Sequence, residues 1–195
     1  MRVLLTGFGP YAHVKENNST RLVNDIQRDW KRNDCELKTL IMPVAWAPVE
    51  VTLETIFLYE EPDLALFLTH APRYPVFTLE QRYYNRAVGP DEFGGVREDE
   101  VIKPDGEDFY LSNIPRLSSL VAYLNKRGVP AVLHDGPEGM DYLCNFVGYL
   151  AGYWVGQRAE EMKYLMLHIP PPDDLPYETG LQGVRLILKF LTNSI

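Results

Sequence analysis

Several features that would define a protein class are missing or scarce in this chain. It has two cysteines among 195 residues, too few for the disulfide framework of a small secreted domain. No apolar run approaches the length that spans a bilayer, and residues 1–7 are a short strand entering a turn without a small-residue cleavage site. We therefore expect a cytoplasmic protein with reduced thiols and no membrane partner.

Basic residues are also in short supply. Lysine and arginine number 19 against 27 aspartates and glutamates, which gives a formal net charge of −8. Because this charge repels phosphate groups, we expect no nucleic-acid partner. With 46% hydrophobic and 24% charged residues the composition is that of a globular protein, and residues 1–195 are expected to form a single domain.

Common cofactor and nucleophile motifs are absent as well. There is no Gly-x-Ser-x-Gly elbow and no phosphate loop. The segment Thr6-Gly7-Phe8-Gly9 follows a strand but lacks the third glycine of a dinucleotide fingerprint. None of the four histidines shares ligand spacing with a cysteine or carboxylate pair. We expect no metal and no cofactor.

Strand-like and helix-like segments alternate along the chain. Apolar runs predict strands at 2–6, 36–42, 63–69, 130–134 and 162–168. Helical spacing predicts helices from a cap at Asn18 or Ser19 to Trp30, from Pro48, from Asn113 or Pro115 to Gly128, at 142–157 and at 178–193. Such alternation indicates an α/β protein, a three-layer α/β/α domain with a largely parallel mixed sheet.

The segment from Ala71 to Phe109 departs from this alternation. It is long, aromatic and polar, with turn signals at Gly89-Pro90 and Gly94-Gly95. A stretch of this length in a compact domain is usually functional or holds short extra strands.

Three residues stand in segments suited to a hydrolase site. Cys144 lies where a turn-rich stretch enters an apolar helix, whose positive end would lower the pKa of a thiol. His168 closes a buried strand, and Glu80 could orient its imidazole as the third group of a nucleophile–base–orienter set. Each also has a plainer interpretation: a buried structural cysteine, a structural strand-end histidine and a solvated glutamate. Cys35 lacks an activating neighbour and is expected to be structural.

The order Glu–Cys–His, within longer motifs, resembles the pyroglutamyl peptidase I family of cysteine peptidases. The motifs that carry the resemblance are Val3-Leu4-Leu5-Thr6-Gly7-Phe8-Gly9-Pro10-Tyr11, Met42-Pro43-Val44, Glu61-Pro62-Asp63, Phe77-Thr78-Leu79-Glu80 with Asn85, Tyr142-Leu143-Cys144-Asn145 and Leu167-His168-Ile169-Pro170.

The resemblance implies an α/β/α peptidase that releases an N-terminal pyroglutamyl residue through a thioester. It implies Cys144 as nucleophile, His168 as base and acid, and Glu80 as the orienting carboxylate. It places Phe8, Tyr11, Tyr142 and Leu143 around the lactam ring. The partners it implies are peptides with N-terminal pyroglutamate and further copies of the chain, in a tetramer.

Some segments depart from the family pattern around the pocket and the loop before the nucleophile. That loop, 136–142, looks one residue longer than in the family, and His13 and Tyr74 fall near the expected ring site. Buried tyrosine hydroxyls there need hydrogen-bond partners, which favours an acyl group with an extra acceptor. Two alternatives follow: a related amidase with shifted acyl specificity, and a non-catalytic α/β binding protein.

Overall fold

The computed structural model describes residues 1–195 except 13, 137–141, 158–161 and 193–195. Within these residues a six-stranded central sheet has the order β2-β1-β3-β10-β4-β9. Its strands are β1 (Arg2–Phe8), β2 (Glu36–Met42), β3 (Leu64–His70), β4 (Phe77–Glu80), β9 (Ala131–His134) and β10 (Lys163–Ile169). The expected largely parallel mixed sheet is confirmed: β2, β1, β3 and β10 run parallel, and the β4–β9 pair runs opposite to them.

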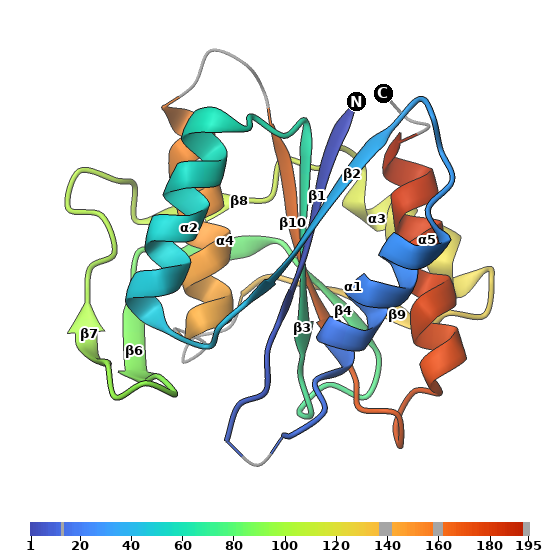
Figure 1. Ribbon diagram of the computed structural model, residues 1–195, viewed down its shortest axis with the longest axis horizontal. Helices are drawn as coiled ribbons and strands as arrows, with labels where there is room; N and C mark the ends of the chain where they lie inside the picture. The colour runs from blue at the N-terminus through green and yellow to red at the C-terminus, as the bar shows by residue number, and fades with distance from the viewer. Residues whose placement is uncertain (13, 137–141, 158–161, 193–195) are drawn as a thin grey trace.

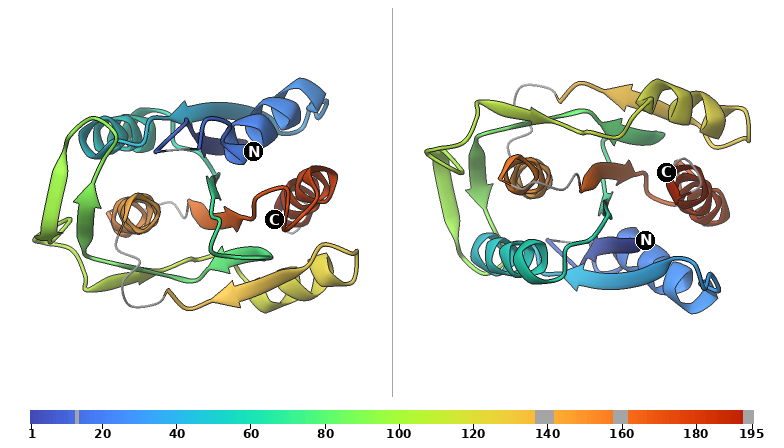
Figure 2. Two further views of the ribbon diagram at one scale, coloured as in Figure 1. Left: turned by 90° about the horizontal axis from the view of Figure 1, so that it is seen from below. Right: turned by 90° about the horizontal axis from the view of Figure 1, so that it is seen from above.

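Helices cover both faces of this sheet, as Figures 1 and 2 show. Helices α2 (Trp46–Tyr59) and α4 (Leu143–Gly156) pack on one face. Helices α1 (Asn18–Asp29), α3 (Leu117–Asn125) and α5 (Tyr177–Thr192) pack on the other. Each face buries its own apolar cluster, because successive side chains of a strand point to opposite faces.

The segment 71–109 does hold extra strands. One of them, β4, joins the central sheet beside β10. The others are short: β5 (Arg82–Tyr84) pairs with β8 (Phe109–Leu111), and β6 (Ala87–Pro90) pairs with β7 (Val96–Glu100).

Three helix starts differ from the sequence prediction, two because of tertiary contacts and one because of backbone conformation. Helix α1 is capped by Asn17, because the Ser19 hydroxyl accepts instead from the Phe8 amide. Helix α2 begins at Trp46 rather than Pro48, since the Asp91 carboxylate accepts the Trp46 amide proton at 2.9 Å. Helix α3 begins only at Leu117, after Arg116 in a left-handed conformation. In the described part of the chain, no helix is long and apolar enough to cross a membrane.

Candidate active site

Cys144 is placed by the first turn of α4, and Asn145 fixes that turn. The Asn145 side-chain amide donates to the carbonyls of Tyr84 (2.9 Å) and Arg86 (2.8 Å) and accepts from the Tyr84 amide (2.7 Å). A buried amide with all these partners holds the helix start against β5. The thiol therefore has a fixed position above the sheet.

Thr69 joins the thiol to the sheet. Its Oγ1 lies 3.2 Å from the Cys144 Sγ. Thr69 is also the register partner of His168 in the β3–β10 ladder, and partners in parallel strands lie about 5 Å apart on one face. Cys144 and His168 thus lie on the same face of the sheet, each next to Thr69.

Glu80 reaches His168 from the neighbouring strand. In the antiparallel β4–β10 ladder, Glu80 pairs with Met166 and Thr78 pairs with His168. Glu80 Oε1 lies 3.1 Å from His168 Nε2, and both side chains are buried. Among the described residues, neither ring nitrogen of His168 makes a hydrogen bond, so the imidazole and the carboxylate are close neighbours and Nδ1 has no protein partner.

The prediction that the helix start lowers the pKa of Cys144 is wrong for the free protein. Burial raises the pKa of this thiol to about 11. The Thr69 hydrogen bond and the backbone lower it less, and the negative charge of Glu80 raises it further. A neutral thiol at neutral pH needs a base to become a nucleophile, and His168 is the neighbouring group able to act as one.

A small pocket of about 130 Å³ opens beside the thiol. It is lined by Phe8, Tyr11, Val44, Thr69, His70, Tyr142, Leu143 and Cys144. All four residues that the resemblance assigned to ring binding are in this set. Because its volume is well below that of drug-sized sites, the pocket suits one small, largely apolar group.

The hydroxyls of the pocket tyrosines already have partners. Tyr11 donates to the carbonyl of His70 at 3.2 Å, and Tyr142 donates to the carbonyl of Pro90 at 2.9 Å. Because both hydroxyls already donate a hydrogen bond, they do not favour an acyl group with an extra acceptor. The other expected differences, His13 and most of the longer loop 136–142, lie outside the described residues.

Tyr74 occupies a different place from the one expected. Its ring packs on the imidazoles of His168 (5.0 Å between centroids) and His134 (5.5 Å), and Tyr74 is not among the residues that line the pocket. Burial and the nearby Glu80 raise its pKa to about 12, so its hydroxyl stays neutral.

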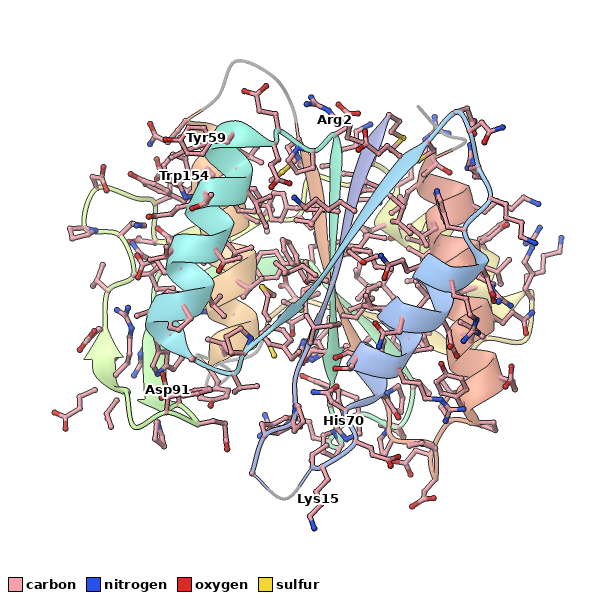
Figure 3. All side chains as sticks on the ribbon, in the orientation of Figure 1. Arg2, Lys15, Tyr59, His70, Asp91 and Trp154 are labelled. Atoms are coloured by element: carbon pink, nitrogen blue, oxygen red, sulfur yellow. The ribbon has the colours of Figure 1, made fainter. Side chains whose placement is uncertain are left out.

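Sequence reasoning missed Thr69, His70 and His134 as neighbours of the site. His70, labelled in Figure 3, ends β3 at the pocket, and burial lowers its pKa. His134 ends β9 with Nδ1 3.4 Å from Glu80 Oε1. The one available signal was their position at strand ends, because their contacts depend on a strand order that the sequence does not reveal.

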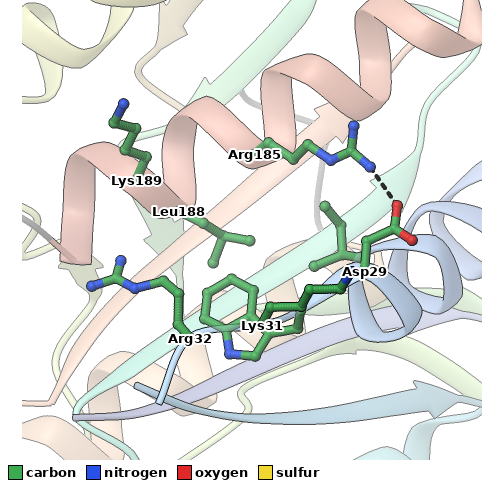
Figure 4. A pocket seen from close by; sticks show the side chains of 8 residues that line it. Asp29, Lys31, Arg32, Arg185, Leu188 and Lys189 are labelled. Carbon is green, nitrogen blue, oxygen red and sulfur yellow. Dashed lines mark hydrogen bonds and ion pairs between the residues drawn. The ribbon is translucent and has the colours of Figure 1, made fainter. Parts of the chain in front are cut away.

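A larger groove lies on the other face of the sheet, between the ends of α1 and α5 (Figure 4). Its lining combines an apolar floor with four basic side chains, and consists of Ile26, Asp29, Trp30, Lys31, Arg32, Arg185, Leu188 and Lys189. Two of its cations are already paired, Arg185 with Asp29 and Arg32 with Asp34. Lysines and arginines at helix C-termini also stabilise the helix dipoles, so this groove has a structural explanation.

Comparison with known proteins agrees with this geometry. The family model described as pyroglutamyl peptidase matches residues 1–181. A pyrrolidone-carboxylate peptidase of Pyrococcus furiosus is 27% identical over 205 residues, with 97% of each chain covered. One from Saccharolobus islandicus is 30% identical over 209 residues, covering 99% of this chain and 96% of the relative.

Solved structures agree as well. A mutant pyrrolidone carboxyl peptidase from Pyrococcus furiosus superposes with a TM-score of 0.91 at 25% identity, and the match covers 100% of both chains. Because the family match includes the strands and the helix that carry Glu80, Cys144 and His168, this chain belongs to the pyroglutamyl peptidase family.

Proposed function

We propose that this protein removes an N-terminal pyroglutamyl residue from peptides, with Cys144 as nucleophile, His168 as base and acid, and Glu80 as orienting carboxylate. One arrangement carries the proposal: a thiol next to a small aromatic pocket, on the same sheet face as a buried imidazole–carboxylate pair. We expect the pocket to bind the flat lactam ring between Phe8 and the two tyrosines, Tyr11 and Tyr142.

The reaction starts with transfer of the Cys144 proton to His168. The thiolate attacks the pyroglutamyl carbonyl carbon, the bond to the next residue breaks, and His168 protonates the departing amine. Water then attacks the thioester, His168 takes its proton, and pyroglutamate leaves as the thiol is restored. Glu80 stabilises the imidazolium that exists in between.

The start of α4 supplies stabilisation for the oxyanion. The first donor within the helix is the Phe146 amide, which bonds to the Tyr142 carbonyl at 3.1 Å. The amides of Leu143, Cys144 and Asn145 come before it, where a helix has no acceptors of its own. Such a donor is worth ~3 kcal/mol when it faces the developing charge.

The substrate assignment is tested with two peptides of otherwise identical sequence, one headed by pyroglutamate and one by proline. We expect release of pyroglutamate from the first and no cleavage of the second, because the proline ring lacks the lactam carbonyl and carries a charged amine. Faster release of another N-terminal acyl group, in a wider panel of acylated peptides, would identify an amidase of shifted specificity. No cleavage of any member by the folded protein would favour a non-catalytic binding protein.

The remaining family expectations are a homo-oligomer, a tetramer by resemblance, and a cytoplasmic location. The exposed side chains Val51, Leu58 and Tyr59 on α2 are apolar surface that a subunit contact would cover.

A further inference from the structure

We infer that His134 is a positioning residue for the proposed reaction: a second imidazole that holds Glu80 in place for His168. The inference rests on the proposed roles of Glu80 and His168. His134 itself touches neither the thiol pocket nor, in the proposed reaction, the reacting atoms.

Two imidazoles approach one carboxylate oxygen. Glu80 Oε1 lies 3.1 Å from His168 Nε2 and 3.4 Å from His134 Nδ1. The pairing follows from the sheet, since Glu80 and His134 are register partners in the parallel β4–β9 ladder. A buried carboxylate is costly without polar neighbours. Two strands each bring an imidazole nitrogen within 3.4 Å of this oxygen, which has no hydrogen-bond partner among the described residues.

Tyr74 closes the arrangement from the other side. Its ring is tilted on His168 at 54° and stands nearly edge-on to His134 at 66°. One tyrosine ring therefore packs against both imidazoles that share Glu80. If one imidazole moves, the Tyr74 ring shifts, and with it the surface on which the other imidazole packs.

The two histidines differ in their access to solvent. The His134 side chain is 28% exposed, whereas those of His168 and Glu80 are each 3% exposed. The adjacent residue Asp135 pairs with Arg82 at 3.3 Å, and Arg73, in the turn before β4, is close enough to Tyr74 to lower the pKa of that hydroxyl. His134 thus lies at the solvent edge of the cluster.

His134 acts on Glu80 by its position. Glu80 Oε1 has an imidazole nitrogen within 3.4 Å from each of two neighbouring strands. Removing His134 takes away one of these polar neighbours from a buried carboxylate, so Glu80 is free to turn away from His168 and kcat falls.

The test compares His134→Ala with His134→Asn, which keeps a side-chain donor at the position of Nδ1. The control is Asp135→Asn, an exposed change on the next residue. We expect His134→Ala to lower kcat about tenfold with little change in KM, while His134→Asn recovers much of the loss. Asp135→Asn should match the parent.

A double-mutant cycle separates positioning from a general structural effect. If His134 acts through Glu80, His134→Ala adds no further loss to Glu80→Gln. The same variants are compared by the pH dependence of Cys144 alkylation with iodoacetamide, which needs no peptide substrate. Inactivity of the parent towards pyroglutamyl peptides would overturn the proposed function, while the alkylation profiles still decide on His134. Additive losses in the cycle, or unchanged alkylation profiles, would overturn the inference.

Discussion

Thr69 is the side chain through which the sheet acts on the proposed nucleophile, Cys144. Its hydroxyl lies 3.2 Å from Sγ and lowers the pKa of the thiol against the opposing effect of burial. Thr69→Val keeps the shape and removes the hydrogen bond, so the pKa of Cys144 rises further and less thiolate forms. A hydrogen bond to a charged group is worth ~1.5–3 kcal/mol, and we expect kcat/KM to fall tenfold or more.

Thr6→Val is the matched control. Thr6 is buried on β1, and its hydroxyl has no hydrogen-bond partner in the described part of the chain. The change should leave kcat/KM within a factor of two. Equal losses in the two variants would mean that the Thr69 hydroxyl has no role in activating the thiol.

The two cysteines should differ in reactivity. Cys35 is 2% exposed and burial raises its pKa, whereas Cys144 is half-buried at a pocket and has His168 on its face of the sheet. Iodoacetamide at neutral pH, followed by mass spectrometry, should label Cys144 first.

In His168→Ala the thiol loses its base, and labelling of Cys144 should require alkaline pH, still rising as the pH approaches the thiol pKa of about 11. Preferential labelling of Cys35, or the same pH profile with and without His168, would contradict the assigned roles.

Among single residues, the sequence pointed to three whose catalytic roles stay a prediction, but it did not reveal their surroundings. Glu80, Cys144 and His168 lie in motifs that are short and contiguous, so they can be recognised along the chain. Thr69 and His134 reach the site through strand pairing, β3 with β10 and β4 with β9. The raised pKa of Cys144 escaped prediction because a helix start is visible in the sequence and the depth of burial is not.

At the scale of elements, helix α4 depends on glycines that let it approach the sheet. A Cβ on Gly148 would lie 2.1 Å from the ring of Tyr83. The Tyr83 hydroxyl donates to the Glu80 carbonyl and accepts from the Met166 amide, both at 3.0 Å. Gly148→Ala should therefore destabilise the protein by ~1–3 kcal/mol and also lower activity, because Tyr83 ties β4 to β10 beside the Glu80–His168 pair.

Gly180→Ala in α5 is the control for helix propensity. No atom lies within 4 Å of a Cβ built at Gly180, so the change should stabilise the protein by up to ~1 kcal/mol. Thermal or urea unfolding measures both variants. If Gly148→Ala and Gly180→Ala were equally stable, α4 would not need the close approach of Gly148 to the Tyr83 ring.

The elements themselves were largely predictable. Strands β1, β2, β3, β9 and β10 and all five helices of the described chain lie where hydrophobic periodicity placed them. The errors lie at helix starts, where Asn17, Asp91 and Arg116 act through tertiary contacts or backbone conformation. The membership of β4 in the central sheet was not predicted, because a four-residue strand inside an irregular segment has no distinct period.

At the scale of the whole molecule, exposed apolar residues of α2 predict association. Tyr59 is 80% exposed and Val51 63% exposed, on a helix whose inner side already packs on the sheet. Light scattering coupled to size exclusion should give the mass of an oligomer, and Tyr59→Glu with Val51→Glu should lower it if α2 lies in the contact. A parent that elutes as a monomer would contradict the expectation, and an unchanged oligomer would place the contact elsewhere.

Cys144 is proposed to carry out the hydrolysis of a pyroglutamyl amide. The most direct measurement is kcat/KM on a chromogenic pyroglutamyl amide for the parent, Cys144→Ala and the matched control Cys35→Ala. We expect turnover by the parent and by Cys35→Ala, and loss of turnover in a folded Cys144→Ala. Turnover that persists without Cys144, or a folded parent that leaves the amide intact, would contradict it.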